Sequence, residues 1–166
     1  MVKIEESGIA FDFPAGSVWQ PELTTRQLKL SHVKACDFVY VDRNRRKLFL
    51  IEVKSSSPKD LRKYVDAIAQ KFGQTLLLAL ALHHRRYLHE ENPAFLLAHP
   101  SVFGREYALC PLLIIRRTQR AWLVPLQEAL QHSLRRMERA FRAEAPLTVD
   151  VPTARRKIHR SIHLLL

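Results

Sequence analysis

The sequence predicts an α/β fold in which helices flank a mixed central β-sheet. Two apolar segments of strand composition, residues 35–41 and 47–54, are joined by a short polar segment and predict a β-hairpin. Two longer segments, from about residue 58 into the mid-80s and over 125–143, place apolar residues at helical spacing. Strands that alternate with long helices indicate one mixed sheet covered by helices.

The chain has 166 residues, of which 47% are hydrophobic and 26% charged, as in an ordinary globular domain. We therefore expect one domain over residues 1–166, with its core at about 35–118. Residues 119–166 are expected to add a C-terminal helix, an edge strand and a basic tail. No segment reaches the ~18 uncharged apolar residues of a membrane span. No signal peptide or disulfide framework is visible either, so we expect a cytoplasmic protein with no membrane partner.

The charge is strongly positive, because 27 Lys and Arg stand against 16 Asp and Glu and leave a net +11. Such an excess attracts polyanions, since each phosphate that it neutralises releases condensed counterions. Nucleic acid, with DNA favoured, is the expected partner. An inert basic surface, or one that docks on an acidic protein, would show the same balance. No separate recognition domain is visible, so specificity would come from a homodimer or a partner subunit.

The elements before the hairpin are harder to predict. Residues 8–14 predict a short strand that ends at Pro14-Ala15-Gly16, and residues 17–30 fit a loop or a short helix. After the hairpin, a serine of 55–57 is expected to cap a helix whose first residue is Pro58. One face of that helix carries Leu61, Val65, Ile68, Phe72 and Leu76.

Residues 89–104 contain two prolines and a glycine and predict a loop. Residues 107–115 predict a strand, whose Pro111 favours a late start or an edge position. The second long helix, about 125–143, has an apolar face made of Leu126, Ala129, Leu130, Leu134, Met137 and Phe141. Residues 147–151 predict an edge strand.

The two strands of the hairpin can be aligned through their turn. Pairing Asp42 with Lys47 places Asp37 opposite Glu52, and Lys54 follows on the same side because side chains alternate with period two. Two carboxylates with Cβ atoms about 5 Å apart repel each other unless a cation lies between them. Mg²⁺ or Mn²⁺ fits such a pair, and a neighbouring lysine can orient a water or stabilise charge on a phosphate.

A Glu-x-Lys sequence on a strand is usually a solvated stripe. In this strand, however, apolar residues fill the opposite face and also precede Glu52 on its own face. Asp37 likewise interrupts an apolar strand. Three polar side chains at the same end of one face therefore indicate a site.

Asp37, followed after fourteen residues by Glu52-Val53-Lys54, by serines and by a long helix, resembles the PD-(D/E)XK nuclease superfamily. The resemblance covers about residues 37–82. It implies a restriction-endonuclease-like core, with Asp37, Glu52 and the Val53 carbonyl as metal ligands and Lys54 as the catalytic lysine. The chain has Cys36 where the motif has a proline, which many members also lack.

Members of this superfamily often add an acid from an N-terminal element and a polar residue from the following helix. Glu6 is the first candidate for the acid, with Glu5 and Glu22 behind it, and Gln70 or Lys71 is the candidate on the helix. For each, an exposed surface side chain is the ordinary explanation. Candidate nucleic-acid contacts are Arg43, Arg45, Arg46 and Lys47 at the turn, Arg116, Arg117 and Arg120 after the third strand, and the basic tail.

These features predict a Mg²⁺-dependent hydrolase, a nuclease that cleaves phosphodiester bonds, with an endonuclease of DNA as the favoured form. Roles in phage defence and in DNA repair both fit. The alternative is a non-catalytic or partner-dependent module of the same fold that binds nucleic acid or a protein. A basic RNA-binding or ribosome-associated protein would explain the charge but not the paired carboxylates. The sequence contains no zinc, P-loop or nucleophile motif.

Overall fold

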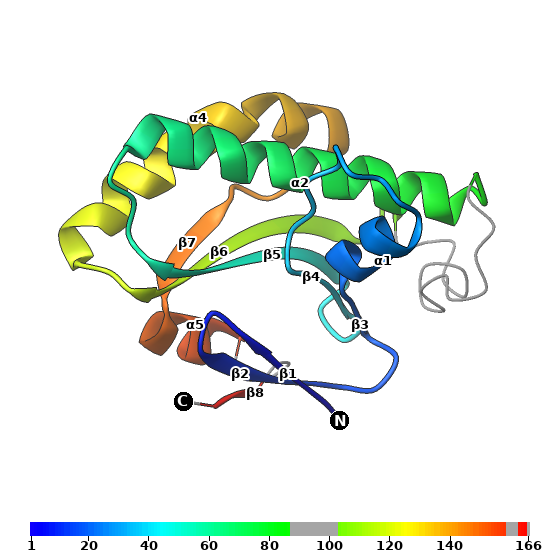
Figure 1. The fold of residues 1–166 in the computed structure, drawn as a ribbon, viewed down its shortest axis with the longest axis horizontal. Helices are drawn as coiled ribbons and strands as arrows, with labels where there is room; N and C mark the ends of the chain where they lie inside the picture. Colours follow the sequence, from blue (N-terminus) through cyan, green and yellow to red (C-terminus); the bar gives the residue numbers. More distant parts are fainter. Residues whose placement is uncertain (87–102, 159–162, 166) are drawn as a thin grey trace.

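The computed structural model describes residues 1–86, 103–158 and 163–165, and it is an α/β protein built in layers (Figure 1). The central layer is a five-stranded mixed sheet with the order β3-β4-β5-β6-β7. Its strands are β3 (Val18–Trp19), β4 (Phe38–Asp42), β5 (Lys47–Ser56), β6 (Ala108–Arg117) and β7 (Leu147–Asp150). The predicted fold class, an α/β protein with a mixed sheet, is confirmed.

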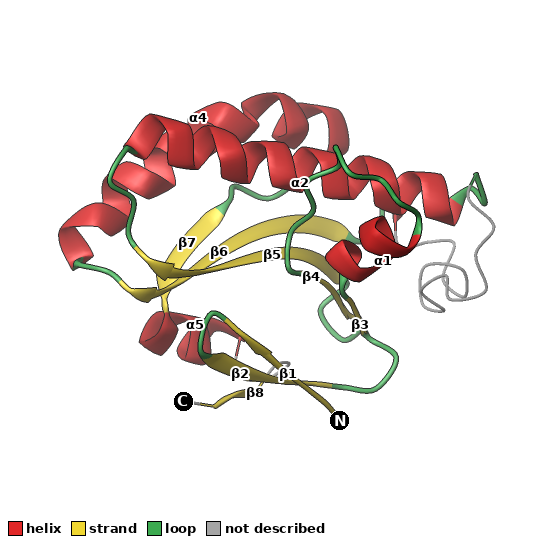
Figure 2. Ribbon diagram, viewed as in Figure 1, coloured by secondary structure: helices red, strands yellow, loops and turns green. Residues whose placement is uncertain are grey.

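The two faces of this sheet are covered differently, as Figure 2 shows. Two long helices, α2 (Leu61–His83) and α4 (Arg120–Phe141), pack on one face, and the short helix α1 (Pro21–Gln27) precedes β4. The other face carries helix α5 (Val151–Ile158) and a small sheet with the order β1-β2-β8. The strands of that small sheet are β1 (Val2–Glu6), β2 (Ile9–Phe13) and β8 (His163–Leu165). Helices thus flank the main sheet as predicted, and the small sheet is an addition that was not predicted.

The predicted hairpin register is confirmed from Asp42 paired with Lys47 to Phe38 paired with Ile51. β3 continues this antiparallel arrangement beside β4, whereas β6 lies parallel to β5 and β7 parallel to β6. Parallel neighbours require crossover connections, which contain α2 and α4 here. Strands β3, β4 and β5 thus form the antiparallel part of the main sheet, and β5, β6 and β7 form its parallel part.

Two apolar cores separate the layers. The helix-side core joins residues of β4, β5 and β6 to α2 and α4, and includes Leu50, Phe72 and Leu130. The core on the other face is rich in aromatic rings; the ring centroid of Phe38 lies 5.1 Å from that of Phe11 and 5.3 Å from that of Phe13. β5 and β6 are buried on both faces, which is why their sequences read as continuous apolar runs.

Helix α2 begins later than predicted. Its N-cap is Asp60, whose Oδ1 accepts a hydrogen bond from the backbone N–H of Lys63 at 3.1 Å, so the prediction of a serine cap and of Pro58 at the first position was wrong. The reason is that β5 continues to Ser56, which still pairs with Arg117 of β6. Among the described helices, α2 is long and apolar enough to cross a membrane by length and composition alone. The core helix of a soluble protein meets the same criteria.

Two prolines lie inside elements rather than at their ends. β6 is an internal strand, contrary to the edge position favoured by Pro111, but its ladder with β7 begins only at Leu112. The missing N–H of Pro111 therefore removes no bond from that ladder. α4 begins at Arg120 and contains Pro125, and Phe141 in its last turn is 45% exposed rather than part of the apolar face.

The remaining elements agree with the sequence in part. The strand over residues 8–14 is β2, and β7 is an edge strand as predicted. The ambiguous segment 17–30 contains both β3 and α1, while β1 was not predicted. Residues 89–102 of the predicted loop lie outside the described residues, and the tail contributes α5 and β8.

Candidate active site

The three residues of the predicted site lie at one end of the β4–β5 hairpin. Asp37 directly precedes β4, one position beyond the last ladder pair, and Glu52 and Lys54 lie on β5. Asp37 does not continue the ladder; its Oδ2 accepts a hydrogen bond from the backbone N–H of Val53 at 2.6 Å. Asp37 is thereby fixed beside the segment that carries Glu52.

Glu52 is fully buried and is surrounded by two ammonium groups. Its Oε1 lies 2.5 Å from Nζ of Lys54 and 2.9 Å from Nζ of Lys71, and its Oε2 accepts a hydrogen bond from Lys71 at 3.1 Å. Oε1 is buried and is paired with both ammonium groups as ion pairs. An isolated buried carboxylate would be costly, and the two lysines offset that cost.

Helix α2 presents one stripe of polar side chains to this end of the hairpin. Tyr64, Lys71 and Thr75 are spaced by seven and four residues and so share a helical face. Oγ1 of Thr75 accepts a hydrogen bond from the backbone N–H of Cys36 at 2.8 Å, and the Tyr64 hydroxyl donates to the Ser56 carbonyl at 3.4 Å. The helix thus anchors the chain directly before Asp37 and covers the end of β5.

The charges of this cluster act on one another. Burial would lower the pKa of Lys71, but the negative charges of Glu52, Asp37 and Glu22 outweigh it and raise that pKa above its ordinary value. Burial, followed by the charge of Glu52, raises the pKa of Asp37 to about 7, which the Val53 N–H and Lys71 only partly offset. Asp37 is therefore poised to titrate near neutral pH.

In protein kept free of divalent metal, we expect Asp37→Asn to raise the free energy of unfolding at pH 8 by about 2 kcal/mol. Between the ordinary pKa of 3.8 and the folded value of about 7, the folded chain holds a proton that the unfolded chain has released. The stability of the wild-type protein therefore falls as the pH rises through that window. Asparagine has no charge to bury and still accepts from Val53.

Urea unfolding at pH 4 and pH 8 in EDTA measures this effect, which should vanish at pH 4. Asp66→Asn is the matched control, because Asp66 is exposed on α2. An Asp37→Asn protein that is no more stable than wild type at pH 8 would contradict the burial of charge at this position.

The three acidic candidates near the N-terminus, Glu6, Glu22 and Glu5, lie at different distances from the site. The β1–β2 turn brings Ser7 to the site, where its Oγ donates to Oε1 of Glu6 at 3.2 Å and to the Val53 carbonyl at 3.4 Å. The charge of Glu6 contributes to the raised pKa of Asp37, so Glu6 lies within electrostatic reach. Oε1 of Glu22 is 3.6 Å from Nζ of Lys71. Glu5 is exposed on β1 and has no described contact with these groups.

Of the two polar candidates on α2, the structure brings only Lys71 to Glu52. Gln70 is exposed, and its Oε1 accepts a hydrogen bond from Nζ of Lys34 at 3.2 Å. Lys71 and Gln70 are neighbours on a helix and therefore point about 100° apart, so only one of them can face the sheet.

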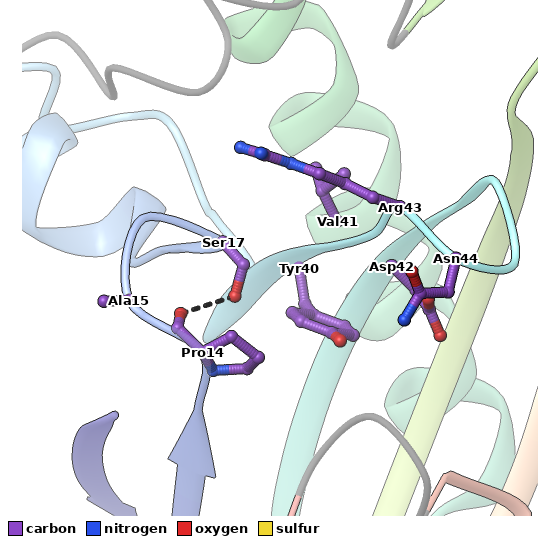
Figure 3. Close-up of a pocket in the computed structure, with 8 residues that line it drawn as sticks. All are labelled: Pro14, Ala15, Ser17, Tyr40, Val41, Asp42, Arg43 and Asn44. Atoms are coloured by element: carbon purple, nitrogen blue, oxygen red, sulfur yellow. Dashed lines mark hydrogen bonds between the residues drawn. The ribbon is translucent and has the colours of Figure 1, made fainter.

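The basic residues of the hairpin turn lie far from the site. The turn is five residues along the strands from Asp37, about 17 Å. Its pocket of about 260 Å³, where Ser17 donates to the Pro14 carbonyl, is seen in Figure 3. There Arg45 pairs with Asp42, and Nζ of Lys47 lies 2.7 Å from Oε1 of Glu144; Arg43 and Arg46 are exposed. Arg116 and Arg117, at the end of β6, lie at the same end as the site.

The donor set at this end suits a hard divalent cation. Asp37 and Glu52 offer carboxylate oxygens, the Val53 carbonyl directly follows Glu52 in the chain, and Oδ1 of Asp37 carries no hydrogen bond among the described residues. Within residues 1–86, 103–158 and 163–165, no three His, Cys, Asp or Glu side chains gather as metal ligands. Water and phosphate oxygens would complete the coordination of Mg²⁺. Such an ion would have to replace an ammonium group at Glu52.

Two neighbours of the site were missed at the level of sequence. Tyr64 lies two helical turns before Lys71, so the stripe that contains Lys71 could have revealed it. Burial and the charge of Glu52 raise the pKa of the Tyr64 hydroxyl. Ser7 had no sequence signal, because its place depends on how the β1–β2 turn packs against the end of β5.

Comparison of the chain with models of known protein families, with curated proteins and with solved structures gives no match. The chemistry of this site therefore has to be inferred from its own geometry.

Proposed function

We propose that this chain is a metal-dependent nuclease that hydrolyses phosphodiester bonds, with DNA as the favoured substrate, on a restriction-endonuclease-like core. The observation that carries the proposal is the convergence of Asp37 and the fully buried Glu52, with Lys54 and Lys71 at Glu52. A purely structural ion pair has no need of a second carboxylate, here Asp37, whose pKa is raised to about 7 by burial and then by the charge of Glu52. Perturbed titration of this kind is typical of functional sites.

The topology supports the same proposal. A β-hairpin followed by a long helix is what the PD-(D/E)XK resemblance implies, and β4, β5 and α2 are such a hairpin and helix, within a mixed sheet. The net charge of +11 favours a polyanionic substrate.

Each residue has a distinct role in the proposed reaction. Asp37, Glu52 and the Val53 carbonyl would hold Mg²⁺ or Mn²⁺, which supplies Lewis acidity and lowers the pKa of a bound water. Lys54, whose side chain is 33% exposed, extends its ammonium from the buried Glu52 toward solvent, where it can stabilise negative charge on a phosphate. Lys71 is a positioning residue, because it contacts both oxygens of Glu52.

The two ion pairs at Glu52 favour an alternative function without catalysis. Lys54 and Lys71 already compensate Glu52 without a metal, as expected for a non-catalytic or partner-dependent module of the same fold that binds nucleic acid or a protein. Such a module would keep the ion pairs for stability and would gain nothing from a divalent cation.

Calorimetric titration with Mg²⁺ and Mn²⁺, combined with a plasmid cleavage assay, separates these functions. We expect the wild-type chain to bind one of these ions and to cleave DNA, with EDTA stopping the reaction. Glu52→Gln should abolish both, because it removes a ligand charge. Gln70→Ala, at an exposed position on the same helix, should preserve both. A chain that neither binds an ion nor cleaves would support the non-catalytic module.

A further inference from the structure

A second pocket lies beside the candidate site, where β5, β6 and β7 end. Its volume is about 640 Å³, within the usual range for ligand sites, and its lining includes Arg116, Arg117, Thr118, Trp122 and Asp150. The carboxyl ends of parallel strands are a common place for ligands in α/β sheets. Nothing in the proposed roles of Asp37, Glu52 and Lys54 uses this pocket.

The sheet register places the pocket directly after the candidate site. Lys54 pairs with Ile115 and Ser56 pairs with Arg117. Because side chains alternate, Arg117 lies on the same face of the sheet as Lys54. Arg117 lies on the strand next to that of Lys54 and two residues further along, so the Cα atoms of the two residues are about 8 Å apart.

The pocket is electropositive. Arg116 and Arg117 are both exposed, and α4 begins at the pocket with no acid in its first turn and no side-chain cap from Gln119. The acid in the lining, Asp150, is engaged at the start of α5, where its Oδ1 accepts from the Thr153 N–H at 2.9 Å. The guanidinium group of Arg117 near a positive helix end suits a phosphate.

Arg116 links this pocket to the β1–β2 turn. Its guanidinium lies over Gly8, so closely that a Cβ at that position would collide with it. Gly8 has φ +72°, a conformation that other residues rarely adopt. The same turn places Ser7 at the Val53 carbonyl, so the turn contacts both the candidate site and Arg116, which lines the pocket.

Trp122 adds an aromatic surface to the cationic one. Its side chain is half-buried, because it packs partly against the helix-side core and also lines the pocket. An indole beside arginines is the arrangement on which unpaired bases stack. A base inside a duplex cannot reach such a surface, because it is stacked and paired within the helix.

We propose that this pocket binds one nucleotide of a single nucleic-acid strand, with its base on Trp122 and its phosphate at Arg117. If the proposed nuclease function holds, on which this consequence rests, the substrate is a strand with unpaired bases near the cleaved bond. Binding itself can be measured without cleavage, in EDTA.

Fluorescence anisotropy with labelled thymidine and uridine dodecamers tests the pocket, with a blunt DNA duplex for comparison. We expect Trp122→Leu and Arg117→Gln each to weaken binding of the DNA strand, the RNA strand or both by about tenfold. Duplex binding should be unaffected by Trp122→Leu. Arg136→Gln removes the same charge from an exposed position on α4 and should have little effect on binding.

Tryptophan emission gives a second readout. Of the two tryptophans in the chain, Trp19 is 7% exposed and donates to Thr24, so quenching by a bound strand should come from Trp122 and disappear in Trp122→Leu. Trp122→Phe keeps an aromatic ring and should bind with intermediate affinity, which guards against a folding defect in Trp122→Leu.

Unchanged strand binding in Trp122→Leu and Arg117→Gln would overturn the proposal. So would an equal loss of strand affinity in Arg136→Gln, or a loss of affinity for the duplex alone. Glu52→Gln should still bind the strand, with the same dependence on Trp122, but should not cleave it. If the wild-type protein does not cleave DNA but Trp122→Leu still weakens strand binding, the proposed binding pocket is supported and the proposed nuclease function is rejected.

Discussion

Lys54→Met is expected to lower the rate of Mg²⁺-dependent DNA cleavage by about 100- to 1000-fold, the usual loss when one group that stabilises transition-state charge is removed. Nζ of Lys54 lies 2.5 Å from Oε1 of Glu52 and reaches solvent, where a phosphate would approach. Methionine keeps much of the apolar length of the side chain. The measurement is the initial rate of cleavage of a labelled oligonucleotide at saturating metal.

The control for charge is Lys59→Met, since Lys59 is exposed in the segment between β5 and α2. It should cleave at close to the wild-type rate. Metal titration of Lys54→Met should still show binding, because Asp37 and Glu52 are intact. If Lys54→Met cleaves as fast as Lys59→Met, the catalytic role of Lys54 must be abandoned.

The largest expected effect on stability is that of the double variant Lys54→Met/Lys71→Met, which should lose about 3–5 kcal/mol of unfolding free energy at pH 7.5. Both substitutions remove the positive charge beside Glu52, which is 0% exposed and would be left as an unpaired buried carboxylate. Each single variant should lose less, because one ammonium remains at Oε1. Urea unfolding in EDTA measures all three losses.

A third substitution identifies the cause. In the double variant, adding Glu52→Gln removes the buried charge and should recover most of the loss, although Glu52→Gln alone destabilises the wild-type protein by leaving two lysines without their partner. Independent, additive effects of the three substitutions would show that the ion pairs do not act as one unit.

The local parts of the fold could be predicted because they depend on neighbouring residues. The turn between Asp42 and Lys47 fixed the register of β4 and β5 as far as Phe38 and Ile51, and Asp37, the next residue, accepts a hydrogen bond from the Val53 N–H beside Glu52. Helix α2 was predicted from the spacing of Val65, Ile68 and Phe72, but its start was displaced. Pairing with β6 extended β5 to Ser56, and no local signal reports that pairing.

The surroundings of the candidate site depend on contacts between distant segments. Which of Gln70 and Lys71 faces Glu52 is decided by how α2 packs across the sheet. Glu6 and Ser7 reach Asp37 and Val53 only because the small sheet folds under the main one. The basic residues of the turn and those of β6 looked equivalent in the sequence, yet they lie at opposite ends of the strands.

By itself, the sequence determined the hairpin, its register, the two long helices and the convergence of Asp37, Glu52 and Lys54. These follow from periodicity and from a short turn, which act within about twenty residues. The tertiary structure alone decided the complete burial of Glu52, its second lysine, the raised pKa of Asp37 and the pocket at Trp122. The physical reason is that burial and electrostatic interaction depend on distances between segments that are remote in the chain.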